Sequence, residues 1–284
     1  MNPAATSAPI LVVQSPEASA PQAAALAEAC GASAPEALAG HAWRLRGVQR
    51  PDIVAAWCEA QRLDHAWVPA GRRFADLKLL AMDMDSTLIT IECIDELGSF
   101  LNLKNQISDI TAQAMRGEID FPESLRRRVA LLAGLSEDAL EDVYDEKLRL
   151  SPGAETLIAA CHRNGIKLLL VSGGFSFFTE RLKERLQLDD TLSNVLEIED
   201  GKLTGRVLGG IIDADAKAAK FHQIARRLGA TREQTAAIGD GANDLKMMAE
   251  AGVSIAYHAK AVVRAQATHS LNYSGLDGVL NLFV

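Results

Sequence analysis

Three apolar runs that end in acidic or small residues limit the fold of this chain more than any other feature. They are LKLLAMDMD at 77–85, GIKLLLVSGG at 165–174 and TAAIGDGAND at 235–244. A continuous apolar run is typical of a strand that is covered on both faces in a parallel sheet. Open sheets of this kind bind their ligands at the carboxyl ends of the strands. We therefore expect an α/β fold, with a doubly wound, mostly parallel, Rossmann-like sheet that carries its chemistry at one edge.

Further segments complete this sheet. GVSIAY at 252–257 predicts another strand, and HSLNYSG at 269–275 predicts a short last one. Residues 197–210 predict a hairpin that turns at Asp200-Gly201. Residues 92–150 are rich in charged and helix-forming side chains, and they follow the first of the three apolar runs directly. A helical cap inserted there is well placed to act as a lid.

The opening segment has a different residue pattern. Residues 1–75 read as three short strands and two helices, which predicts a small α/β domain ahead of a second domain at 76–284. A chain of 284 residues agrees with about two domains. Nothing in this segment carries recognisable chemistry. It is compatible with a regulatory module or one that forms a homodimer, and equally with a scaffold.

Charge and composition exclude several classes of partner. The net charge is −8 and the pI is 5.3, which disfavours binding to nucleic acid or to an anionic membrane. No apolar stretch approaches the ~20 residues of a membrane span, and the first residues lack the pattern of a signal peptide. The four cysteines are scattered, as expected of buried thiols in a reducing compartment. We expect a soluble, cytoplasmic protein.

Carboxylates gather at two of the strand ends. Asp83 and Asp85 stand one residue apart after the first run, and Asp240 and Asp244 follow the third run with Asn243 beside them. Taken alone, the first pair fits a helix-capping turn equally well. The second group is a stronger signal, because glycines on both sides of Asp240 allow a close turn that brings several oxygen donors together.

The second run ends in groups that suit an anion. Ser172 and Gly173, followed by another glycine, offer a hydroxyl and free backbone N–H groups where a strand enters a helix. An ordinary tight turn is the competing interpretation. Lys217 lies near a predicted helix start, where most lysines are simply solvated. The hydroxyls of Ser86 and Thr87 are interpreted as supports for the first turn or for a leaving oxygen.

Taken in order, DMDST, SGG, Lys217 and GDGAND resemble the four motifs of the haloacid dehalogenase-like phosphatases, over residues 79 to about 260. The resemblance implies that Asp83 is a nucleophile that forms an aspartyl-phosphate, and that Asp85 is the general acid and base. It implies a metal bound by the Asp83 carboxylate, the Asp85 carbonyl and Asp240. A hard cation with oxygen ligands, Mg²⁺, suits this chemistry.

The same resemblance assigns the remaining motif residues. Asp244 and Asn243 would support the metal site, and Asn243 is also counted among the substrate-binding residues. Ser172, the Gly173 N–H and Lys217 would hold the transferring phosphoryl oxygens, where catalysis of this reaction largely resides.

The cap residues indicate the substrate. LITIEC and AMRGEIDFPESLRRRVALLAG resemble the cap of the phosphoserine phosphatase family, which catalyses the last step of serine biosynthesis. In that family the residue matching Glu92 faces the substrate ammonium, and the one matching Arg128 faces its carboxylate. Met115 and Phe121 match apolar positions that close over the substrate. Without the resemblance, Arg128 would be read as part of a solvated helix face and Glu92 as a helix-start acid.

Alternatives stay open within and beyond this class. Another small phosphorylated amino acid, phosphohomoserine or phosphothreonine, is a related candidate, because one methylene is worth only ~1–3 kcal/mol. An aspartate-phosphorylated receiver is disfavoured, since Asp85 would hydrolyse the phosphoaspartate. A non-catalytic amino-acid-binding module describes residues 1–75 alone. With three strands, that segment is shorter than the βαββαβ amino-acid-sensing module of some relatives, so serine feedback through it is not expected.

Overall fold

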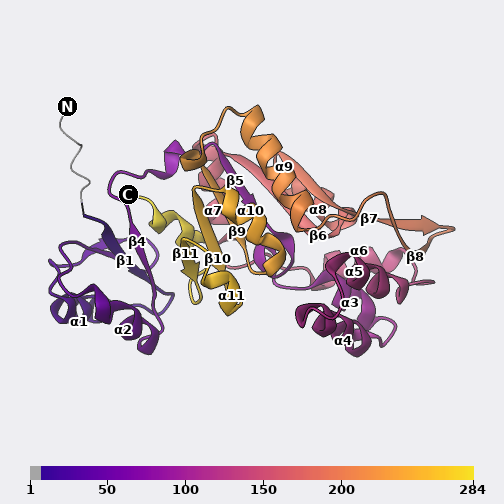
Figure 1. Cartoon of the computed structure of the whole chain (residues 1–284), viewed down its shortest axis with the longest axis horizontal. Coiled ribbons are helices and arrows are strands. Elements are labelled where there is room, and N and C mark those ends of the chain that lie inside the picture. Colours follow the sequence, from indigo (N-terminus) through magenta and orange to yellow (C-terminus); the bar gives the residue numbers. More distant parts are fainter. Residues whose placement is uncertain (1–7) are drawn as a thin grey trace.

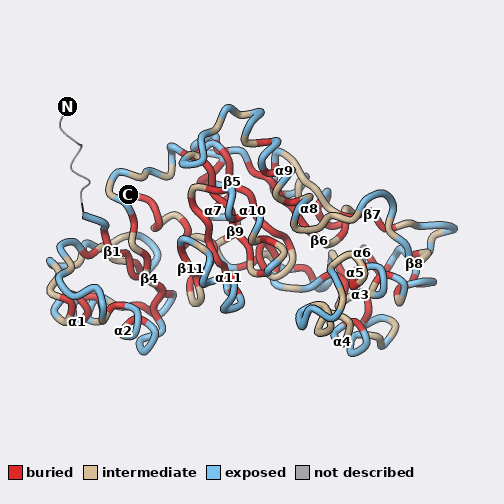
Figure 2. Tube along the Cα trace, in the orientation of Figure 1, coloured by how far each residue is buried: buried red, intermediate tan, exposed pale blue. Residues whose placement is uncertain are grey.

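The computed structural model describes residues 8–284 and contains two sheets (Figure 1). The expectation that the chain starts without a signal peptide falls largely on residues 1–7, outside the described part. Figure 2 shows the buried residues concentrated along the central strands. Within residues 8–284, no helix has both the length and the apolar character that a membrane crossing requires.

The N-terminal sheet has four strands, so the expected count of three is wrong. Its sheet order is β2-β3-β1-β4, with every neighbouring pair antiparallel. The missed strand is β2, whose three residues are exposed or half-buried and lack an apolar pattern. Along the chain the elements run βαββαβ: β1 Ile10–Gln14, α1 Ala20–Cys30, β2 Glu36–Leu38, β3 Ala42–Leu45, α2 Val54–Ala60 and β4 Asp64–Val68. The strand count therefore no longer argues against a sensing role.

One face of this small sheet packs on the C-terminal part of the chain. Val12 and Val68 share a core cluster with Leu276 and Phe283. The buried Asp64 carboxylate accepts three backbone N–H groups from residues 272–274, at 2.6–3.1 Å. The N-terminal module is thus joined to the rest of the molecule by apolar packing and by a buried charge with three donors.

The large sheet has seven strands in the order β11-β10-β9-β5-β6-β7-β8. All neighbours are parallel except β7 and β8, as expected for a doubly wound sheet that ends in a hairpin. The predicted short strand at 269–275 is present. The bounds are β5 Leu79–Met82, β6 Lys167–Phe175, β7 Asp190–Glu199, β8 Lys202–Leu208, β9 Thr235–Gly239, β10 Val253–Tyr257 and β11 His269–Leu271.

Helices cover both faces of this sheet, which accounts for the continuous apolar runs. Leu80 and Met82 pack in one cluster with residues of α7 and α8, whereas Leu79 and Ala81 pack in another with residues of α9, α10 and α11. Successive side chains of a strand point to opposite faces, so every residue of β5 must be apolar. The helices are α7 Ala154–Arg163, α8 Ser176–Leu186, α9 Ala214–Arg227, α10 Leu245–Glu250 and α11 Ala261–Arg264, followed by a 3₁₀ segment at Leu276–Leu282.

The helical insertion forms a cap beyond the carboxyl ends of the strands (Figure 1). It consists of α3 Cys93–Ser99, α4 Lys104–Met115, α5 Phe121–Ala130 and α6 Asp138–Asp142. Its two connections to the sheet lie side by side, with an antiparallel bridge between Ile89 and Leu150. The β7–β8 hairpin also touches the cap, because Leu203 exchanges backbone hydrogen bonds with Gly134 and Leu135. The hairpin turns at Asp200 and Gly201, both with positive φ, as predicted.

Candidate active site

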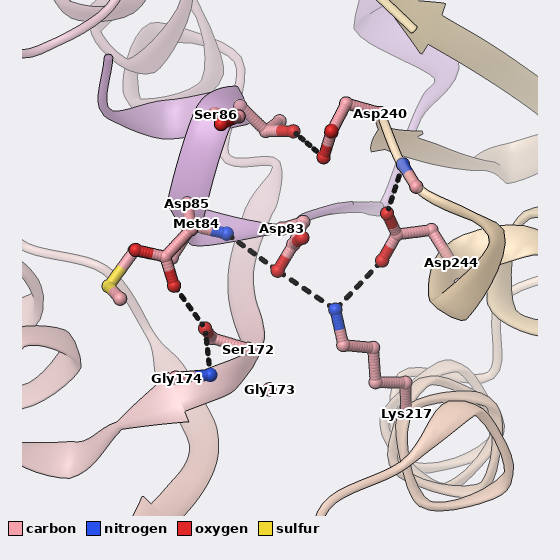
Figure 3. A network of polar contacts seen from close by, with 12 residues as sticks. Asp83, Met84, Asp85, Ser86, Ser172, Gly173, Gly174, Lys217, Asp240 and Asp244 are labelled. Carbon is pink, nitrogen blue, oxygen red and sulfur yellow. Dashed lines mark hydrogen bonds and ion pairs between the residues drawn. The ribbon is translucent and has the colours of Figure 1, made fainter. Parts of the chain in front are cut away.

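The site begins where β5 ends and the chain turns sharply. Asp83 is 4% exposed, and its Oδ1 accepts the Met84 N–H at 2.8 Å. Ser86 adopts a left-handed conformation with φ 55°, which reverses the chain after Asp85. The Asp85 carboxylate then accepts the Cys93 N–H at 2.9 Å. This turn brings the two predicted carboxylates to one place (Figure 3).

Lys217 joins two strand ends. It is fully buried in the first turns of α9, and its Nζ lies 2.8 Å from both Asp83 Oδ1 and Asp244 Oδ1 (Figure 3). Burial alone would lower the pKa of the ammonium, but the charges of Asp244 and Asp83 outweigh it and raise that pKa. Lys217 therefore stays charged and offsets part of the negative charge at Asp83 and Asp244.

Asp83, Asp240 and Asp244 form a cluster whose ligand atoms lie within 4.8 Å of one another. Burial and the neighbouring Asp244 charge raise the pKa of Asp83 well above its usual range, and the same two causes raise the pKa of Asp240 to about 6. Three carboxylates against the single ammonium of Lys217 leave an excess of negative charge. Hard oxygen donors with such an excess fit a divalent cation, so these residues could hold one.

The glycines around Asp240 are required by close packing. A Cβ at Gly239 would lie 2.5 Å from the Asp244 carboxyl group, and one at Gly241 would lie 2.1 Å from Asn243 Oδ1. Asp244 Oδ2 accepts the Gly241 N–H at 3.1 Å. Both oxygens of Asp244 thus have protein partners, which suits a supporting position. Among residues 8–284, Asp240 Oδ1 accepts only the Thr87 hydroxyl, at 3.3 Å.

Ser172, Gly173 and Gly174 lie in a bulge between β6 and β7. The register moves from Val171↔Leu192 to Phe175↔Asn194, so the three residues 172–174 of β6 lie opposite the single residue Ser193 of β7. The Ser172 hydroxyl accepts the Gly174 N–H at 2.8 Å and lies 3.5 Å from Asp85 Oδ2. The bulge thus presents hydroxyl and backbone groups beside the Asp85 carboxylate.

A cavity of about 570 Å³ separates this edge of the sheet from the cap. All four predicted cap residues line it, and so do core residues from three strand ends: Glu92, Met115, Phe121, Arg128, Asp83, Asp85, Gly173, Asp240 and Asn243. Ser172, Lys217 and Asp244 lie behind this lining, where they are fully buried. The structure therefore brings every predicted site residue to one place.

The cap supplies two oppositely charged groups that have no direct ion-pair partner within residues 8–284. Burial lowers the pKa of the Arg128 guanidinium, whose hydrogen bond goes to the Ser124 carbonyl at 3.3 Å. Burial and the Asp85 charge raise the pKa of Glu92 to about 7, and its partner is the Ser86 hydroxyl at 2.7 Å. A zwitterion that entered the cavity would supply both missing counter-charges.

Two charged residues that line the cavity were not predicted from the sequence. Asp95 lies one helical turn beyond Glu92, and burial raises its pKa. The i, i+3 spacing of the two acids is a signal that could have identified it. Lys260 follows β10 and also lines the cavity, and its Nζ lies 3.7 Å from Sδ of Met115 in the cap. Its place just after a parallel strand is a signal that could have identified it, because the other site residues were predicted from their positions at the ends of parallel strands.

Comparison with known proteins agrees with this geometry. The family described as haloacid dehalogenase-like hydrolase matches residues 80–249. The chain therefore belongs to the haloacid dehalogenase-like hydrolases, and the expected fold class is confirmed.

The relatives narrow this assignment. A phosphoserine phosphatase of Polaromonas sp. is 52% identical over 74% of this chain and 91% of its own length. A probable phosphoserine phosphatase from Vibrio cholerae has a TM-score of 0.83 at 36% identity, covering 97% of this chain and 86% of its own. Within the hydrolases, the chain belongs to the phosphoserine phosphatase family, as its motifs predicted.

The likeness includes the N-terminal module. A hydrolase of the same superfamily from Salmonella enterica serovar Typhi has a TM-score of 0.87 at 33% identity, and it covers 97% of this chain and 98% of its own. Coverage this complete includes the βαββαβ module, so these relatives share both parts of the molecule.

Proposed function

We propose that this chain hydrolyses O-phospho-L-serine to L-serine and phosphate through an aspartyl-phosphate on Asp83, as the last step of serine biosynthesis in the cytoplasm. The observation that carries the proposal is that Arg128 and Glu92 line the same cavity as Asp83, which pairs with Lys217 of α9. A guanidinium suits the substrate carboxylate because its planar fork can bind two oxygens. The carboxylate of Glu92 suits the substrate ammonium, because the two groups have opposite charges.

In the first half-reaction the Asp83 carboxylate attacks phosphorus and the bond to the serine oxygen breaks. Asp85 gives that oxygen a proton; burial raises the pKa of this carboxyl group, which favours its protonated form before the reaction. Lys217, Ser172 and the Gly173 backbone hold the phosphoryl oxygens. Fixed donors of this kind stabilise the transferring group without reorganisation during the reaction.

In the second half-reaction a water molecule attacks the phosphoaspartate and Asp85 takes its proton. Phosphate leaves and Asp83 is regenerated as a carboxylate. Mg²⁺ bound by Asp83, the Asp85 carbonyl and Asp240, with support from Asp244 and Asn243, would supply further neutralisation of the phosphoryl charge. Phe121 and Met115 would keep bulk water away from the reacting groups.

The test is kcat/KM over a panel of L-phosphoserine, phosphothreonine, phosphohomoserine and p-nitrophenyl phosphate, each with Mg²⁺. We expect phosphoserine to be the best substrate by at least about tenfold, since an extra methylene or methyl group is worth ~1–3 kcal/mol. A higher value for phosphothreonine or phosphohomoserine would move the assignment to that amino acid. A stable phosphoprotein without turnover would favour a receiver.

A further inference from the structure

Asn194 lies in β7, outside all the motifs that define the active site, yet it touches two of the segments that carry them. Its side chain is buried, with 2% of the residue exposed. Nδ2 donates to the Gly173 carbonyl at 2.8 Å, and Oδ1 accepts the Ile212 N–H at 2.9 Å. Gly173 belongs to the bulge of β6, and Ile212 belongs to the segment that leads into α9.

The bond to Gly173 replaces a missing contact of the sheet. Because β6 skips in register at residues 172–174, regular pairing with β7 is interrupted there. A buried carbonyl without a donor is costly, and the Asn194 amide supplies that donor. The bond also fixes the plane of the Gly173–Gly174 peptide group. The N–H of the same peptide group donates to the Ser172 hydroxyl at 2.8 Å.

The bond to Ile212 fixes the start of α9. The next residue, Asp213, caps this helix: its Oδ1 accepts the Ala216 N–H at 3.0 Å, and its carbonyl accepts the Lys217 N–H at 3.0 Å. Lys217 then reaches Asp83 at 2.8 Å. One amide group therefore joins the phosphate-facing bulge to the helix that carries the buried lysine.

We infer that Asn194 is a positioning residue for the phosphoryl site. Its amide fixes the position of the Gly173 backbone relative to the start of α9, so that the bulge and Lys217 act on the same phosphoryl group. The inference rests on the proposed function only in taking that group to be a phosphate ester. Asn194 is not among the residues that line the cavity, so it would not contact a substrate bound there. Its effect is accordingly the same for every phosphate monoester, unlike that of a cap residue.

The test compares Asn194→Ala with Ser193→Ala. Ser193 is the preceding residue of β7, and its hydroxyl hydrogen-bonds that of Thr179 at 2.7 Å, away from both motif segments. Asn194→Ala is expected to lower kcat by about 10- to 100-fold, since a shift of about 1 Å in a catalytic group costs about 100-fold. The loss should be equal for phosphoserine and p-nitrophenyl phosphate, with KM changed by less than about threefold. Ser193→Ala should keep kcat within about threefold.

A second readout does not need turnover. With Mg²⁺ present, orthovanadate should raise the Tm of the wild type and of Ser193→Ala, and raise that of Asn194→Ala much less. Failure of phosphoserine turnover with retained p-nitrophenyl phosphate turnover would refute the proposed substrate and leave this test intact. If Asn194→Ala does not fold, Asn194→Asp keeps the acceptor for Ile212 and removes the donor to Gly173, and the same losses are expected.

Three results would overturn the inference. One is a folded Asn194 variant with wild-type kcat and a wild-type response to orthovanadate. Another is an equal loss of kcat in Ser193→Ala, which would make the effect one of general strand stability. The third is a wild type that neither cleaves p-nitrophenyl phosphate nor responds to orthovanadate, since it would have no phosphoryl site to position.

Discussion

Replacing Arg128 by Met should damage phosphoserine turnover selectively. The guanidinium lies in the cavity wall on α5, with a single hydrogen bond to the Ser124 carbonyl and no ion pair among the described residues. Burial lowers its pKa, so the surroundings disfavour the charge in the free protein. A substrate carboxylate that paired with the guanidinium would stabilise its charged form. Met keeps most of the apolar stem but cannot bind an anion.

The size of the effect follows from this environment. Removing one partner of a buried, hydrogen-bonded charge pair costs about 2–5 kcal/mol. At about 1.4 kcal/mol per factor of ten, kcat/KM for phosphoserine should fall by roughly 30- to 4000-fold. The free energy of unfolding should stay the same or rise slightly, because a half-buried cation without an ion-pair partner is removed. For p-nitrophenyl phosphate, which has no carboxylate, kcat/KM should change by less than about threefold.

The chain offers a matched control beside this residue. Arg127 lies on the same helix, but its side chain is 48% exposed and pairs with Glu123 at 2.7 Å on the surface. Arg127→Met should leave kcat/KM for both substrates within about twofold, since exposed pairs contribute about 0–1 kcal/mol. For wild type and both variants, kcat/KM is measured from steady-state phosphate release. Equal losses on both substrates, or equal losses in both variants, would remove Arg128 from the recognition role.

Three further predictions concern charge. Lys217→Met should lower kcat by at least about 100-fold and cost about 3 kcal/mol of unfolding free energy at pH 8. The cost should be smaller at pH 5, because burial raises the pKa of Asp83 and a proton on that carboxyl group can replace the ammonium; urea titration at the two pH values checks this. Burial lowers the pKa of His269 to about 4. The contribution of the neutral imidazole to the free energy of unfolding is therefore complete above its usual pKa of about 6.5, and it is lost as the pH falls towards 4. Wild type should therefore lose about 2 kcal/mol more than His269→Gln between pH 7 and 5, and equal losses would contradict this. Glu92 has a pKa of about 7 in the free protein, so kcat/KM for phosphoserine should fall as the pH drops below 7, whereas Glu92→Gln should be less active and flatter over the same range.

The sequence predicted the large sheet well because its physical signal is strong. A strand buried on both faces must be apolar at every position, so β5, β6 and β9 could be read without a structure. Carboxylates at the ends of such strands are costly to bury, so their presence there indicates that they bind something. The site followed from the rule that parallel strands place their carboxyl ends at one edge.

The sequence failed where structure depends on distant partners. β2 has three residues, EAL, and pairs with β3 without burying an apolar face, so no local pattern marks it. Its omission led to the wrong strand count for the N-terminal module. The bulge at Ser172 is set by pairing with β7 and by the Asn194 amide, which lies far along the chain. A pattern read over a few residues cannot detect such a bond. The boundary at residue 75 and the role of the opening module remain predictions.

The assignment of Asp83 as nucleophile is tested most directly by Asp83→Asn. Asn keeps the size of the side chain and an acceptor for the Met84 N–H, but it cannot attack phosphorus as a carboxylate does. Phosphate release from L-phosphoserine should be measured for both proteins, with Mg²⁺ and with excess EDTA. We predict Mg²⁺-dependent release by the wild type and none by Asp83→Asn under either condition. Sustained turnover by folded Asp83→Asn would contradict the assignment.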